Sequence, residues 1–179
     1  MTQHTIRRRC VAFLAIGAMA ALAMPSTAQA APQLADLGVK QSMSVKASNG
    51  ESLEGKDLRA IQLATYTAAS VDGNTIVGYD LTTNTALAPD ITAAAKTAGA
   101  TDANLTVNGK NDPMAWVVKN LTDSRSDLWS GKLRNFCNSL AKQTNFAKQE
   151  GTAVATASQD KTTMSTGNVL VPGIYAIVD

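Results

Sequence analysis

The chain has 179 residues, and its 16 lysines and arginines against 14 aspartates and glutamates give a formal net charge of +2. The first 30 residues are predicted to be a secretion signal; without Arg7, Arg8 and Arg9, the remaining 149 residues carry 13 basic and 14 acidic groups. That remainder has no histidine, because His4 lies in the leader, and Cys137 is its only cysteine. These counts exclude a histidine-based triad, a zinc site of histidines or several cysteines, an internal disulfide and a basic nucleic-acid surface.

The N-terminus has the three parts of a signal peptide, residues 1–30. Three arginines precede the apolar stretch 10–24, and Ala28-Gln29-Ala30 has the small-x-small form of a cleavage site. The apolar stretch is shorter than the roughly 20 residues of a transmembrane helix. We therefore expect cleavage before Ala31 and a secreted, extracellular protein with no membrane span after signal removal. A retained membrane anchor is the alternative.

The region 39–87 is predicted to be β-structure. Residues 43–47 alternate in polarity, and 58–69 form a run rich in threonine, tyrosine, leucine and isoleucine. Such residues suit a pleated, half-buried surface. Asp72-Gly73 lies between apolar β-branched segments, which predicts a hairpin with a return strand over 76–81.

Helical spacing follows in an excursion over about 89–148. Pro89 suits the first turn of a helix that ends at Gly99, and Asp112-Pro113 predicts an N-cap and the start of a second helix. A third helix carries its apolar residues on one face: Trp129, Leu133, Phe136, Cys137 and Leu140. This stripe predicts a core-facing helix with a buried cysteine, and a membrane-surface or partner helix is the alternative.

The C-terminal part returns to β-structure. Residues 149–168 are expected to form a loop or a weak edge strand. Pro172-Gly173 has the composition of a type II turn, between strands over 169–171 and 174–178. Residues 31–179 are therefore expected to form a single, mainly β domain with a helical insertion, α+β overall.

Acid–base catalysis would depend on carboxylates, lysine or tyrosine, because histidine is missing. The glutamates are only Glu51, Glu54 and Glu150, and aspartates such as Asp72 and Asp112 lie in turn or cap contexts. Calcium-loop, serine-nucleophile and phosphate-loop motifs are not found. We assign no catalytic, cofactor-binding or metal residues and expect no enzyme and no cofactor.

An isopeptide crosslink is a further chemistry for an exported β-domain without disulfides. A lysine amine buried beside an asparagine or aspartate can condense with it when a protonated carboxylic acid lies nearby. Lys40 or Lys46 could supply the amine. Spacing selects no partner, so no crosslink residues are assigned.

Four segments carry a family resemblance: residues 53–66, with the sequence LEGKDLRAIQLATY; 78–83, GYDLTT; 112–117, DPMAWV; and 171–179, VPGIYAIVD. In this order they resemble the N-terminal domain of sortase-assembled fimbrial (pilin) subunits of Gram-positive actinobacteria, the isopeptide-forming fimbrial proteins. The resemblance implies an immunoglobulin-like β-sandwich with a helical insertion, displayed on the cell wall in a structural or adhesive role. It implies other pilin subunits, or host or glycan surface ligands, as partners.

The resemblance also predicts how the protein would be retained at the cell surface. The sequence has no LPxTG-type sorting signal, so we expect cell-wall attachment only if a longer chain supplies one. The chain is then the N-terminal domain of a fimbrial subunit or a truncated, secreted form. The alternative function is a secreted ligand- or carbohydrate-binding module.

Overall fold

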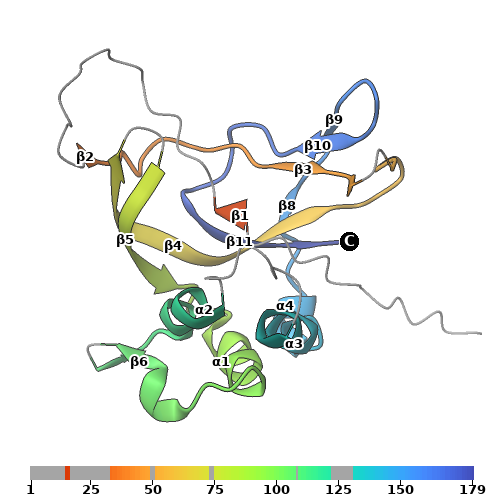
Figure 1. The fold of residues 1–179 in the computed structure, drawn as a ribbon. Helices are drawn as coiled ribbons and strands as arrows, with labels where there is room; N and C mark the ends of the chain where they lie inside the picture. The colour runs from red at the N-terminus through yellow and green to blue at the C-terminus, as the bar shows by residue number, and fades with distance from the viewer. Residues whose placement is uncertain (1–14, 17–32, 49–50, 73–74, 108, 122–130) are drawn as a thin grey trace, which may run out of the picture.

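Residues 15–16, 33–48, 51–72, 75–107, 109–121 and 131–179 are described by the computed structural model in Figure 1. They form an α+β arrangement of antiparallel sheets and helices. The strands are β1 (Ala15–Ile16), β2 (Gln33–Leu34), β3 (Ser44–Lys46), β4 (Arg59–Asp72), β5 (Thr75–Thr83), β6 (Thr106–Val107), β7 (Lys110–Asn111), β8 (Thr152–Ala153), β9 (Thr156–Ala157), β10 (Thr163–Ser165) and β11 (Gly173–Val178). The helices are α1 (Ala88–Thr97), α2 (Pro113–Leu121), α3 (Gly131–Leu140) and α4 (Thr144–Ala147), with the short 3-10 turn η2 (Asp102–Asn104).

Strand β4 is the centre of the largest sheet. Its 14 residues pair antiparallel with β5 and β8 along one side and with β11 and β2 along the other. Strand β1 pairs with the outer side of β11. The predicted hairpin is confirmed, because β4 and β5 pair as far as Asp72 and Thr75; its connecting residues 73–74 lie outside the described part of the chain.

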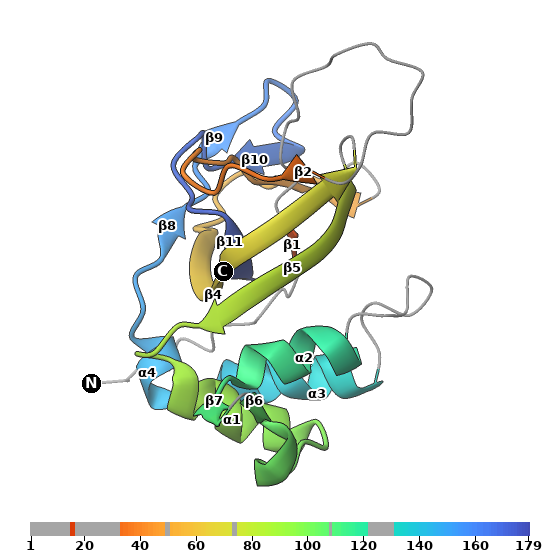
Figure 2. The same ribbon diagram turned by 90° about the vertical axis from the view of Figure 1, so that its left-hand side faces the viewer.

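A second, three-stranded sheet has the order β3-β10-β9. It contains the predicted strand over 43–47, and β8, β9 and β10 lie in the segment expected to be a loop or weak edge strand. Figure 2 shows this sheet over one face of β4 and β11, and the helices under the other face. The described sheets remain open, and the coarse α+β prediction is confirmed.

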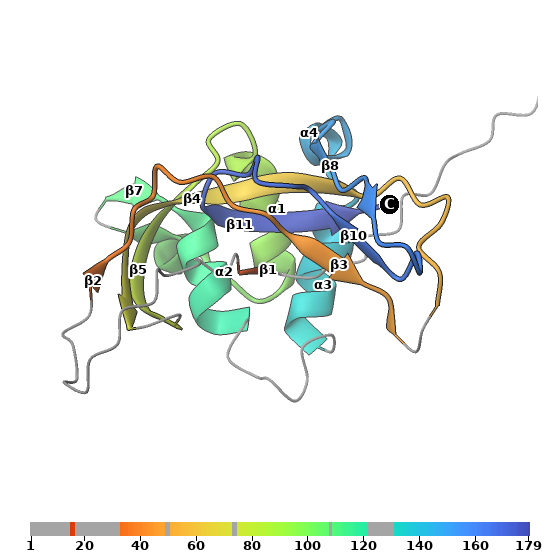
Figure 3. The same ribbon diagram turned by 90° about the horizontal axis from the view of Figure 1, so that it is seen from above.

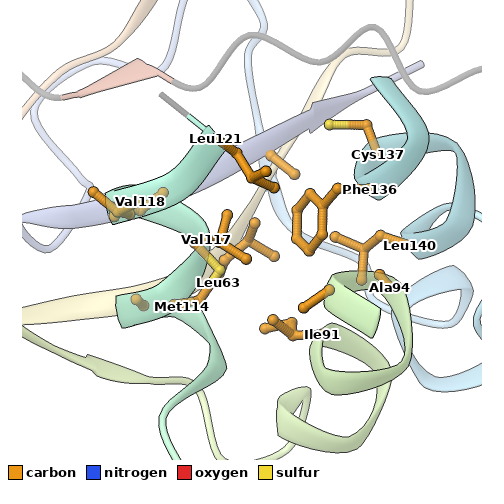
Figure 4. Close-up of a cluster of buried hydrophobic side chains, with 14 of the residues drawn as sticks. Leu63, Ile91, Ala94, Met114, Val117, Val118, Leu121, Phe136, Cys137 and Leu140 are labelled. Carbon is orange, nitrogen blue, oxygen red and sulfur yellow. The ribbon is translucent and has the colours of Figure 1, made fainter. Parts of the chain in front are cut away.

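The central sheet is apolar on both faces, because each face packs on a separate cluster. On the helix side, Leu63 and Ile174 join side chains from α1, α2 and α3. Figure 4 shows Phe136 in the midst of this cluster, close to Val117 and Leu140. Full burial of each such side chain contributes roughly 1.5–3 kcal/mol.

The opposite face packs on the second cluster. There Tyr175 and Ile177 belong to one buried cluster with Met43 and Met164. The β4–β11 pair is thus enclosed between a helical layer and a strand layer, which explains why β11 is a continuous apolar run rather than an alternating one.

The helices follow the predicted spacing. Helix α1 begins with Pro89 in its first turn and is followed by Gly99 at a φ of 105°. In α3, Leu133, Phe136, Cys137 and Leu140 are buried, so the core-facing interpretation is confirmed; Trp129 lies outside the described residues. None of the described helices has the length and apolar character that crossing a bilayer requires.

The cap of α2 differs in detail from the prediction. Asp112 does precede the helix, but its carboxylate accepts the backbone N–H of Thr83 at 3.2 Å and also the Thr83 hydroxyl. That hydroxyl oxygen accepts the N–H of Met114 at 3.0 Å. Asp112 therefore caps the helix through Thr83, and this connection fastens α2 to the end of β5.

The predicted type II turn at Pro172-Gly173 is wrong. A type II turn needs a positive φ at its third residue, and Gly173 has none; it is the first residue of β11. A Cβ atom at Gly173 would lie 2.2 Å from the carbonyl oxygen of Ala64. Glycine is required here by the close approach of β4, not by a turn.

Candidate functional site

Strand β11 is the element around which the candidate site is built. All six of its residues are buried, and the strand contains no charged residue. One edge pairs with β4 from Gly173↔Thr65 to Val178↔Arg59. The backbone groups of the other edge point away from β4, and a buried backbone N–H or C=O needs a partner.

The outer edge of β11 is paired with β1. Ala15 lies opposite Tyr175 and Ile16 opposite Ile174, in antiparallel register. Figures 1 and 3 both show β1 beside β11. Ala15 and Ile16 belong to the predicted leader, so the strand that completes this edge comes from the segment expected to be removed on export.

The start of β11 is held in place by local contacts. The Pro172 carbonyl accepts the backbone N–H of Tyr66 at 3.2 Å. The Tyr175 hydroxyl donates to the Val171 carbonyl at 2.6 Å, and burial raises the pKa of this phenol. These contacts, together with the close approach at Gly173, position β11 rigidly against β4 on its inner edge.

A second feature is a cleft of about 250 Å³ at the junction of β4, β8 and the segment before β11. Its polar lining comes from amide and hydroxyl side chains: Gln62, Asn84, Gln149, Thr152 and Tyr175. Asn84 Nδ2 donates to the Gln62 carbonyl at 3.0 Å, whereas the buried Nε2 of Gln62 has no hydrogen-bond partner. The lining groups are neutral, which suits a small uncharged polar ligand.

The lysines considered for an isopeptide crosslink do not meet its condition. Lys40 and Lys46 are both exposed, whereas the reaction requires a buried amine. No crosslink is therefore built on either residue.

Several carboxylates in the described part of the chain make structural contacts. Asp90 is 6% exposed and accepts the Phe146 backbone N–H at 2.7 Å and the Asn145 side-chain amide at 3.1 Å. Glu54 pairs with Lys161 on the surface. Among the described residues, no three histidine, cysteine, aspartate or glutamate side chains are grouped as a metal ion would need.

Comparison of the chain with protein-family models, with curated proteins and with solved structures found no match.

Sequence reasoning found the apolar strand 174–178 but missed its outer edge. Nothing in the sequence indicated that residues of the leader pair with it, because the apolar stretch 10–24 was explained by export alone. The uncharged run over residues 169–178 was the available signal, since an uncharged strand edge has to be covered.

Proposed function

We propose that this chain is a structural or adhesive cell-surface protein, the N-terminal domain or a truncated form of a fimbrial (pilin) subunit, without catalytic activity. It is exported through its N-terminal leader and works outside the cell. It is attached to the cell wall only where a longer chain supplies a sorting signal. We also propose the finer fold, an immunoglobulin-like β-sandwich with a helical insertion.

The observation that carries the proposal is the uncharged outer edge of β11, paired with leader residues Ala15 and Ile16. Removal of the leader would leave this strand edge open to another polypeptide, as a subunit of an assembly requires. The filled core on both faces of β4 and β11 supports a role as a building unit. The four segments that resemble fimbrial subunits support the same assignment.

Fractionation of producing cells tests this function. An antibody against residues 31–179 should detect the protein in the medium or the cell-wall fraction, and intact mass should place its N-terminus at Ala31. In the cell wall it should occur in high-mass species that survive boiling in detergent, as covalent polymers do. A protein found only inside the cell with its leader attached would contradict the proposal.

The second candidate is a secreted ligand- or carbohydrate-binding module, which the neutral polar cleft favours. A sugar is uncharged and rich in hydroxyls, and the side chains of Gln62, Asn84 and Gln149 can donate to or accept from such groups. A glycan array would show selective binding that Gln149→Ala weakens. Gln159 is exposed and does not line the cleft, so Gln159→Ala provides the control.

A further inference from the structure

Export would leave the outer edge of β11 without the strand that now pairs with it. In the full chain, Ala15 and Ile16 pair with Tyr175 and Ile174. Cleavage before Ala31 removes both leader residues. The exposed edge would be uncharged and free of proline, which are the features that leave a strand edge open to pairing.

The new N-terminus cannot replace β1. It would enter the fold through β2, where Leu34 pairs with Ser70 of β4. The place of β1 beside Ile174 is level with Ala64 of β4, because Ala64 pairs with Ile174. The six residues of β4 from Ser70 to Ala64 span about 20 Å, whereas the two residues Ala31 and Pro32 can extend over only about 7 Å. Ala31 and Pro32 therefore cannot reach the place of β1, which leaves the outer edge of β11 available to another molecule.

The opposite edge of the same sheet is protected against such pairing. Strand β5 pairs with β4 with two register irregularities and carries exposed Asp80. Strand β11 pairs with β4 with one irregularity, between Ile174 and Tyr175, and has no charged residue. Bulges and charges are features by which edge strands avoid pairing with other chains. The two edge strands therefore differ chiefly in charge, and the uncharged strand β11 is favoured as the interface strand.

Strand β11 resembles its partner strand β1, because both consist of uncharged residues. Its residues Ala176-Ile177 repeat the Ala-Ile sequence of β1, and β1 runs antiparallel to it. Two copies related by a two-fold axis normal to the sheet would also pair their β11 strands antiparallel, with the helical layers on the same side. Two-fold dimers are the commonest closed assembly.

We propose that the processed protein pairs through the outer edge of β11 with β11 of a second copy, and that the leader occupies this edge until it is removed. The proposal rests on the proposed function only in requiring export and cleavage. The leader thus acts as an intramolecular competitor of dimer formation.

The test compares processed protein, collected from the medium and verified by intact mass, with full chain produced without export. Sedimentation velocity over a dilution series should show a concentration-dependent dimer for the processed protein and a monomer for the full chain. Hydrogen exchange should show the β11 amides that point away from β4 protected in the dimer and faster by at least tenfold on dilution to monomer. The amides of β4 that pair with β5 serve as the internal control.

A variant of the full chain tests the competition directly. Ile16→Pro removes a backbone N–H and disfavours strand pairing without altering the domain from Gln33 onward, so this full chain should dimerise. Ala21→Pro, outside β1, is the matched control and should remain monomeric.

The outcomes separate the two proposals. A processed protein that is monomeric at every concentration, or a dimer whose outward-facing β11 amides do not change on dilution, overturns the pairing and leaves export standing. An Ile16→Pro chain that stays monomeric overturns the role of the leader as competitor. Failure to find any processed protein outside the cell contradicts the proposed function itself.

Discussion

Gly173→Ala is expected to destabilise the fold strongly, because this position has no room for a Cβ atom. The new Cβ would lie 2.2 Å from the Ala64 carbonyl oxygen and 3.0 Å from Gln62 Nε2. Since close C···O contacts in proteins are about 3.3 Å, β11 and β4 would have to separate locally by about 1 Å. The obstacle is backbone within a sheet, so rotation of a side chain cannot relieve it.

The magnitude follows from three contributions. Overpacking costs about 1–3 kcal/mol, and loss of the adjacent Tyr66 N–H to Pro172 carbonyl hydrogen bond costs about 1 kcal/mol. The lower entropy of the unfolded alanine chain offsets about 0.4–1 kcal/mol. We therefore expect a net loss of about 1–3.5 kcal/mol in the free energy of unfolding, or about 2–14 °C in Tm for a chain of this size.

Urea unfolding followed by tryptophan fluorescence measures this loss, with buried Trp116 as a reporter. Gly78→Ala is the matched control, because Gly78 is also a strand glycine but its Cβ would meet only the Ser70 hydroxyl, at 2.9 Å. That hydroxyl can rotate, so the control should lose less than about 1 kcal/mol. Equal stability of the two variants would refute the close-approach argument.

Three further changes probe the rest of the fold. Phe136→Ala opens a cavity at a side chain with 0% exposure, and urea unfolding should show a loss of about 3–5 kcal/mol. Asp90→Ala leaves the Phe146 N–H without its acceptor and should cost about 1–3 kcal/mol in thermal unfolding, with Asp90→Asn recovering part of it. Burial, and next the neighbouring Tyr79, raise the pKa of Tyr66 to about 12. The folded state therefore holds this proton more tightly than the unfolded state, so stability should fall as pH rises from about 10 to 12, and Tyr66→Phe should reduce that fall in urea midpoints.

Local signals predicted the elements that local interactions form. The hairpin of β4 and β5 followed from apolar strands on either side of Asp72-Gly73, and α3 followed from the spacing of Leu133, Phe136 and Leu140. In each case, the residues that determine the element lie within a few positions of one another. The periodicity of a short segment is therefore sufficient evidence.

Contacts between distant residues determined what the sequence could not indicate. Pro172-Gly173 has the composition of a turn, but the carbonyl of Ala64, far away along the chain, makes glycine necessary in a strand. Asp112 has the composition of an N-cap, but Thr83 accepts the helix N–H in its place. A single sequence gives no information on which distant backbone will approach a given residue.

The candidate site is likewise formed by a contact between residues that lie far apart along the chain. An apolar segment near the N-terminus is sufficient for export, and an apolar strand around Tyr175 is sufficient for a core, so each had a complete local explanation. Their pairing would give the predicted leader a second role, because Ala15 and Ile16, which belong to the segment expected to direct export, also cover the outer edge of β11. We propose that assembly is in this way coupled to export, with the edge becoming available only after the leader has been removed.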